Sequence, residues 1–212
     1  MPGSPVERVA VESLLDAMEG VVYLLDRDGI IAAVGREGWR RFAQDNDTPA
    51  LAEADAVVGQ PLLSFIRGEA VRRAYEGYLD ALRSGRRRGI SFEFSCDSPT
   101  LARRMRLCIS TVMEGSAPAG FLFQSLLLEE RTRPPVSLFD AAVTAAALAE
   151  RGGQPLLAMC SYCQRVATEG EQDRREWIEA ETYYRRGGTS AVRISHGICP
   201  RCMKERVEPL LA

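Results

Sequence analysis

Two closely spaced pairs of cysteines near the C-terminus constrain this chain more than any other feature. Both have the form C-x-x-C: Cys160 with Cys163, and Cys199 with Cys202. Two residues between the cysteines let the backbone turn so that both sulfurs reach one ion at about 2.3 Å, and two such pairs complete the tetrahedral shell of zinc. The spacing therefore predicts a zinc site with four cysteine ligands.

The 35 residues between the two pairs exceed the spacing of a short zinc ribbon, so the sequence predicts an insertion between two metal-binding turns. We expect a helix over 173–186, with Trp177, Ile178 and Tyr184 as its apolar positions. A segment as short as 155–212 has a thin core, and metal binding can supply folding free energy that apolar burial does not. We therefore expect a zinc-stabilised, zinc ribbon-like module.

Two alternatives remain for this cysteine chemistry. His196, the only histidine, lies three residues before Cys199 and is a possible alternative ligand or a donor behind the ligands. A dithiol redox protein would instead use Cys199 and Cys202, because a helix start lowers a thiol pKa. The second C-x-x-C pair favours metal over dithiol exchange.

The first 130 residues alternate between patterns typical of strands and of helices. Apolar periodicity predicts helices over 9–18, 37–46 and 69–84, a short helical turn within 57–66, and a hairpin formed by 21–25 and 30–34. Three further strands are expected over 89–96, 101–113 and 119–128. Three successive strands joined by tight turns are antiparallel, so the class is α+β, with helices on one face of the sheet.

Three stretches of this region resemble the PAS family, over residues 6–130. They are the hairpin 21–31, the segment Trp39-Arg40-Arg41-Phe42-Ala43, and the segment 58–66. The resemblance implies a five-stranded antiparallel sheet, a face that can hold a small ligand of unknown identity, and an outer face that often forms dimers. The runs around the two cysteine pairs resemble a cysteine-rich module found at the end of many bacterial sensory proteins.

A change in composition separates the two parts. Pro134 and Pro135 favour an extended chain after residue 130. Ser137 and Asp140 are then spaced like a capping box, and they open an alanine-rich segment that predicts a connector helix over 138–150. The predicted organisation is a PAS-like domain at 6–130, a linker and connector helix at 131–154, and a zinc module at 155–212.

A nucleic-acid-binding regulator that uses the zinc module is a further alternative for the function. The charge balance gives it little support. The chain has 27 basic and 29 acidic residues, a net charge of -2, whereas phosphate binding needs several unbalanced cations on one face. The arginine clusters that favour it are 86–88, 103–104 and 185–186. The N-terminus lacks the apolar core of a secretory signal, and no run reaches the length of a membrane span, so we expect a cytoplasmic protein.

The sequence offers no catalytic residues for an enzyme. No histidine precedes residue 196, which excludes a histidine-ligated heme in the PAS-like part, and no phosphate-binding glycine loop is present. Cys96 and Cys108 are expected to be ordinary strand residues, with Cys108 buried. We therefore expect a non-enzymatic bacterial signalling protein whose partner is another signalling protein or a second copy bound through the PAS-like domain.

Overall fold

The computed structural model describes residues 9–46, 48–140, 143, 155–170 and 175–212. Its first elements are α1 (Val11–Asp16), β1 (Val21–Asp26) and β2 (Ile31–Val34). The β1–β2 turn forms because Asp26 Oδ1 accepts hydrogen bonds from the backbone N–H groups of Asp28 and Ile30, both at 2.9 Å. Gly29 takes the positive φ of 87° that this turn needs. The predicted hairpin is therefore present.

A group of helices follows the hairpin. It consists of α2 (Arg36–Asp45), the short 3-10 turns η2 (Pro49–Leu51) and η3 (Ala54–Ala56), α3 (Leu62–Phe65) and α4 (Glu69–Arg83). The indole N–H of Trp39 in α2 donates to the carbonyl of Leu51 at 2.7 Å, which ties the following loop to this helix. The ring of Trp39 also meets that of Tyr23 edge-on, so α2 packs on strand β1.

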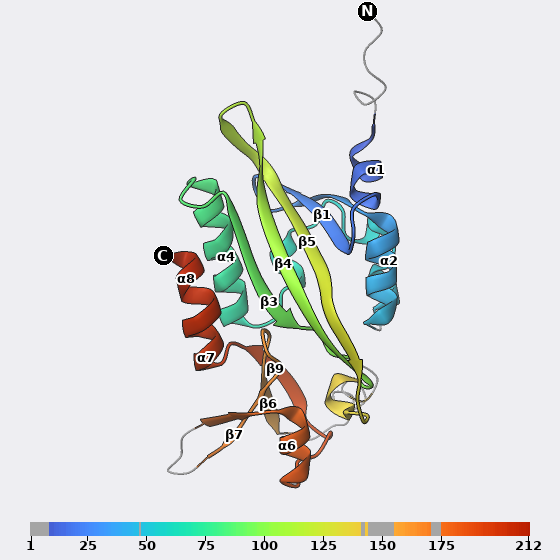
Figure 1. The fold of residues 1–212 in the computed structure, drawn as a ribbon, viewed down its shortest axis with the longest axis vertical. Coiled ribbons are helices and arrows are strands. Elements are labelled where there is room, and N and C mark those ends of the chain that lie inside the picture. Colours follow the sequence, from blue (N-terminus) through green and yellow to red (C-terminus); the bar gives the residue numbers. More distant parts are fainter. Residues whose placement is uncertain (1–8, 47, 141–142, 144–154, 171–174) are drawn as a thin grey trace, which may run out of the picture. The chain divides into compact units, whose positions relative to one another are not determined.

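Strands β3 (Gly89–Ser95), β4 (Leu101–Glu114) and β5 (Ala117–Thr132) complete a five-stranded sheet. Its strand order is β2-β1-β5-β4-β3, so the chain returns after the helices to place β5 beside β1 (Figure 1). The β1–β5 pairing is antiparallel, with Tyr23 opposite Phe123. This arrangement confirms the predicted α+β class and the five-stranded sheet.

The described chain divides into two compact units, each made of three separate segments of the sequence. Unit 1 comprises 1–65, 79–91 and 107–126, and unit 2 comprises 66–78, 92–106 and 127–212. Helix α4 and strands β3, β4 and β5 each contribute residues to both units. The cysteine-rich segment therefore belongs to the same unit as part of the sheet.

Unit 1 has an apolar core on one face of its strands. Burial alternates along β4 and β5, as expected where one face of a strand packs on helices and the other does not. The fully buried side chains of this unit include Leu25, Ile31, Leu82, Phe121 and Phe123. On the other face, α1 places Leu15 against Val22 and Ala33, so that helix covers the first two strands there.

The C-terminal part of unit 2 contains a second, smaller sheet. Its strands are β6 (Leu156–Cys160), β7 (Val166–Glu169), β8 (Arg175–Ile178) and β9 (Arg193–Gly197), in the order β8-β7-β6-β9. Helix α6 (Ala180–Arg185) lies between β8 and β9 in sequence. The chain ends with α7 (Pro200–Cys202), the π-helical turn η6 (Met203–Val207) and α8 (Glu208–Leu211).

The prediction of one helix over 173–186 was wrong in its first half. Residues 175–178 form β8, with Ile178 opposite Val166 and Trp177 opposite Ala167, and the helix begins only at Ala180. Trp177 and Ile178 favour strands, and the pairing with β7 decides between a strand and a helix for so short an apolar run.

The predicted connector helix over 138–150 falls mostly outside the described residues. Within them, Ser137–Phe139 forms the 3-10 turn η4. Asp140 Oδ1 accepts a hydrogen bond from the backbone N–H of Val143 at 3.2 Å. Among the described residues, no helix has both the length and the apolar character needed to span a membrane.

Candidate metal centre

The parallel pairing of β6 with β9 brings the two cysteine pairs together. Leu156 lies opposite Arg193 and Cys160 opposite Gly197, so both strands end at the same edge of the small sheet. Cys160 is the last residue of β6, and Cys199 follows two residues after the end of β9. The 35-residue separation in sequence is thus removed by strand pairing.

The first C-x-x-C pair lies in a tight turn. The backbone N–H of Cys160 donates to the carbonyl of Arg165, and that of Gln164 donates to the carbonyl of Cys160, both at 2.8 Å. Gln164 has a φ of 56°, the only positive value on a non-glycine residue among the described positions. This left-handed residue reverses the chain directly after Cys163 and leaves both sulfurs of the pair on one side.

The second pair begins the C-terminal helical segment. Cys199 is the N-cap of α7, and its sulfur accepts a hydrogen bond from the backbone N–H of Cys202 at 3.4 Å. Pro200 occupies the first helical position, where its missing N–H costs nothing. The backbone N–H of Cys199 in turn donates to the sulfur of Cys160 at 3.3 Å, which joins the two pairs.

The four sulfurs form one compact group. All of them lie within 4.8 Å of one another, and the sulfurs of Cys163 and Cys199 are 3.8 Å apart. A tetrahedral ion with metal–sulfur bonds of about 2.3 Å has sulfur–sulfur edges of about 3.8 Å. Cys160, Cys199 and Cys202 are buried and Cys163 is half-buried. Four ligands with this burial match a closed structural site and leave no ligand position free for a substrate.

Hydrogen bonds within the cluster shift the pKa values of three of its thiols. Hydrogen bonds from Cys163, then Cys202, and then backbone N–H groups hold the pKa of Cys160 far below its usual range. The hydrogen bonds that Cys163 and Cys202 make with Cys160 raise the pKa of Cys163 to about 12 and also raise that of Cys202. One thiolate thus suppresses the ionisation of Cys163 and Cys202, and these thiols would have to lose their protons when a metal ion binds.

His196 is not part of the group of potential ligands that the described residues bring together, which consists of the four cysteines. It lies on β9 opposite Met159, and burial, followed by the charge of Arg67, lowers its pKa. Cys96 and Cys108 also stand apart from the group. Cys108 is half-buried rather than buried as expected, because it lies between the buried Leu107 and Ile109 and so faces the opposite side of β4. Its sulfur is 3.5 Å from the hydroxyl oxygen of Ser91.

A buried tyrosine pair beside the cysteines was not predicted from the sequence. Tyr162 lies between the two cysteines of the first pair, and its hydroxyl is 2.9 Å from that of Tyr78 on α4. Both side chains are almost completely buried, and the ring of Tyr162 packs on Phe92 of β3. Burial raises the pKa of Tyr78 to about 12 and raises that of Tyr162 as well, so both hydroxyls stay protonated.

Further hydrogen bonds attach the first cysteine turn to β3 within unit 2. The backbone N–H of Ser95 donates to the carbonyl of Tyr162, and the N–H of Asp97 donates to Gln164 Oε1, both at 2.9 Å. Arg206 donates to the carbonyls of Glu93 and Tyr162. The turn thereby satisfies backbone groups along β3, an edge strand of the five-stranded sheet.

Three of the four arginines in the unit 2 clusters expected for nucleic-acid binding, 103–104 and 185–186, take part in ion pairs. In the two clusters that belong to unit 2, the pairs are Arg103 with Glu130, Arg104 with Glu93 and Glu129, and Arg186 with Glu176. Phosphate binding requires several cations without such partners, and in these two clusters only Arg185 lacks a carboxylate partner among the described residues.

Comparison with known proteins gives structural matches only. No protein-family model matches the chain, and no curated protein matches it. Among solved structures, the chain is similar to the PAS domain from Bordetella pertussis BvgS, at 14% identity and a TM-score of 0.42, covering 57% of this chain and 85% of that one.

Two further similarities are to domains of sensor kinases. The photoactive yellow protein domain from the sensor histidine kinase Ppr of Rhodospirillum centenum matches at 14% identity and a TM-score of 0.36, over 55% of this chain and 92% of that one. A sensory box sensor histidine kinase from Vibrio cholerae matches at 10% identity and a TM-score of 0.34, over 58% and 92%. At these identities and TM-scores, the matches support no statement about a ligand or an activity of this chain.

Proposed function

We propose that this chain is a non-enzymatic signalling protein in which a PAS-like sheet is joined to a structural zinc site. The observation that carries the proposal is the closed group of four cysteine sulfurs within 4.8 Å of one another. Zinc suits it best because soft thiolates, four ligands and a tetrahedral edge length together favour that ion. The role is regulatory and involves no turnover.

The contacts of the first cysteine turn support a transmitting role. Tyr162 reaches Tyr78 on α4, and Ser95 and Asp97 of the β3 region bind the same turn. A change at the metal site would therefore act directly on residues of the PAS-like sheet and its helix. The dithiol alternative receives less support, since Cys199 and Cys202 share their cluster with two further thiols.

Metal content with a thiol count tests the zinc site. We expect about one zinc per purified chain. Of the six cysteines, only Cys96 and Cys108 should react with a thiol reagent before a strong chelator is added, and all six afterwards. Metal-free protein in which Cys199 and Cys202 cycle as a disulfide would contradict the structural site and support the redox alternative.

Deletion of the gene in its native host tests the regulatory role. We expect a changed transcriptional response that the wild-type gene restores, without accumulation of any one metabolite. Accumulation of a metabolite that the purified protein then converts would instead identify an enzyme and refute the proposal.

A further inference from the structure

Unit 2 contains a cavity next to the cysteine group that the proposed function does not use. Its volume is about 640 Å³, and it is formed by the end of β3, by β4, by the end of β5, by the first cysteine turn and by α6. Cys163, the least buried of the four cysteines, lines it. This volume lies within the usual range of small-molecule sites, about 300 to 1,000 Å³.

The wall of this cavity contains a buried ion pair. Arg133 Nη1 donates to Asp97 Oδ2 at 2.7 Å, and the two side chains are only 10% and 13% exposed. The guanidinium of Arg133 also lies over the ring of Phe139, 4.4 Å from its centroid, and donates to the carbonyl of Ser98 at 2.8 Å. These contacts hold Arg133 in place and keep it and Asp97 largely out of water.

The carboxylates that line the cavity are already paired. Asp97 and Glu181 pair with Arg133, Glu129 pairs with Arg104, and Glu179 pairs with Arg165 outside the cavity. Arg133 thus faces two carboxylates, and the lining as a whole has five arginines against four carboxylates.

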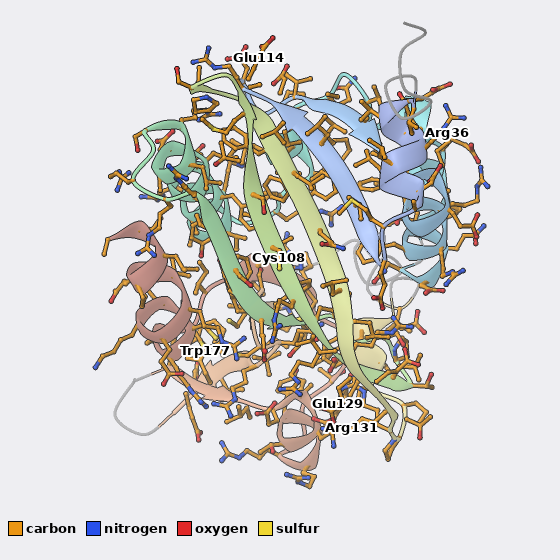
Figure 2. The ribbon with its side chains drawn as sticks, turned by 45° about the horizontal axis from the view of Figure 1, so that its top comes forward. Arg36, Cys108, Glu114, Glu129, Arg131 and Trp177 are labelled. Atoms are coloured by element: carbon orange, nitrogen blue, oxygen red, sulfur yellow. The ribbon has the colours of Figure 1, made fainter. Side chains whose placement is uncertain are left out.

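Two arginines of the same wall have no carboxylate partner among the described residues. Arg131, near the end of β5, is labelled beside Glu129 in Figure 2. Arg185, in the last turn of α6, donates to the hydroxyl of Thr182 at 2.7 Å. Both are exposed and both line the cavity. The lining therefore has one positive charge in excess, and Arg131 and Arg185 are its cations without a carboxylate partner among the described residues.

We propose that this cavity binds a small anionic ligand through an oxyanion group, a carboxylate or a phosphate, held by Arg131 and Arg185. Guanidinium groups present parallel N–H donors that match the two oxygens of such groups. The ligand would contact the loop of Cys163 and the start of α6. A signal would thus enter unit 2 beside the metal site, outside the apolar core of unit 1.

Titration calorimetry on the zinc-loaded full chain tests this site, with inorganic phosphate and succinate as separate probes at constant ionic strength. We expect saturable binding of at least one probe, and the stronger probe distinguishes a phosphate ligand from a dicarboxylate. The double variant Arg131→Gln/Arg185→Gln should weaken that binding by about tenfold or more, because each charge-assisted hydrogen bond lost has an effect of this order.

The matched control is Arg36→Gln/Arg88→Gln, which removes the same charge from two exposed arginines of unit 1. It should leave the affinity unchanged within twofold. Equal weakening by both double variants would show non-specific charge attraction and overturn the site, as would the absence of saturable binding of both probes at millimolar concentration. Zinc content is measured on each variant, so that a loss of ligand binding can be distinguished from a loss of the metal site.

Discussion

Unit 1 and unit 2 are stabilised by different kinds of interaction. Unit 1 buries aliphatic and aromatic side chains such as Leu25, Phe121 and Phe123 between strands and helices. Unit 2 adds to its apolar contacts four clustered thiols, a tyrosine pair joined through its hydroxyls and a buried arginine–aspartate pair. Apolar burial tolerates shape changes with graded losses, whereas polar groups out of water must each keep a partner. Removing one of these polar groups should therefore destabilise unit 2 by leaving a buried partner unpaired, whereas trimming one apolar side chain should destabilise unit 1 in a graded way.

The largest expected effect is loss of the metal site. In Cys160→Ser/Cys202→Ser, zinc should fall from about one per chain to none, and amide exchange should lose protection in β6, β9 and α6. Zinc binding supplies about 10 to 16 kcal/mol in small metal-dependent folds, comparable to the whole stability of a domain. Hydrogen exchange with mass spectrometry measures this. Cys108→Ser is the control, since Cys108 lies in unit 1 and outside the cysteine group. Unchanged protection of β9 in metal-free protein would refute the dependence of this part of the fold on zinc.

The second effect tests unit 1. Phe123 is fully buried and stacks on Tyr23, with the ring centroids 4.9 Å apart. Phe123→Ala should lower the free energy of unfolding by about 3 to 5 kcal/mol, measured by urea titration. Zinc content should stay near one per chain in native buffer. Loss of zinc in this variant would show that the two units cannot be separated energetically.

The third effect concerns the buried ion pair of unit 2. Arg133→Met leaves the carboxylate of Asp97 nearly buried without its cation and should cost about 3 kcal/mol in urea unfolding. Adding Asp97→Asn should recover part of that loss, because the unpaired charge is then removed. Arg201→Gln, which breaks an exposed helical pair with Glu205, should leave the unfolding midpoint unchanged. Equal midpoints for Arg133→Met and Arg201→Gln would contradict the role of burial.

The smallest effect comes from the tyrosine pair. Tyr162→Phe leaves the hydroxyl of Tyr78 buried without its partner and should cost about 1 to 2 kcal/mol. The double variant Tyr78→Phe/Tyr162→Phe should be more stable than the sum of the two single losses predicts, because no orphaned hydroxyl remains. A double-mutant cycle by urea unfolding measures this coupling. Additive losses would mean that the two hydroxyls do not interact.

The features that the sequence predicted are those encoded by nearby residues. The hairpin around Asp26 and Gly29, the amphipathic helix α4 and the C-x-x-C pairs all depend on spacings of a few residues, which fix turns and faces directly. The α+β class followed from the order of these local patterns. The grouping of all four cysteines also followed, because their shared chemistry supplies the missing long-range information.

The features that could not be predicted depend on tertiary contacts. Strand β8 is too short for its apolar residues to distinguish a strand from a helix, and its pairing with β7 decides the outcome. Nothing in the local sequence of Tyr162 indicates that it bonds to Tyr78, which is 84 residues away. The attachment of the cysteine turn to β3 also leaves no signal in the sequence, because it uses backbone groups that every residue carries.

The hydrogen bonds of the first cysteine turn have a consequence for the order of folding. The bond between Tyr78 and Tyr162 closes a loop of 84 residues, and that between Arg206 and Glu93 spans 113. Contacts at such separations form late, because the entropy of closing a long loop is lost before the contact is gained. During refolding, the edge of β3 is therefore exposed until the first cysteine turn binds to it. Over that interval the exposed strand edge is where association between unfinished chains would begin, so rapid zinc uptake would also suppress aggregation.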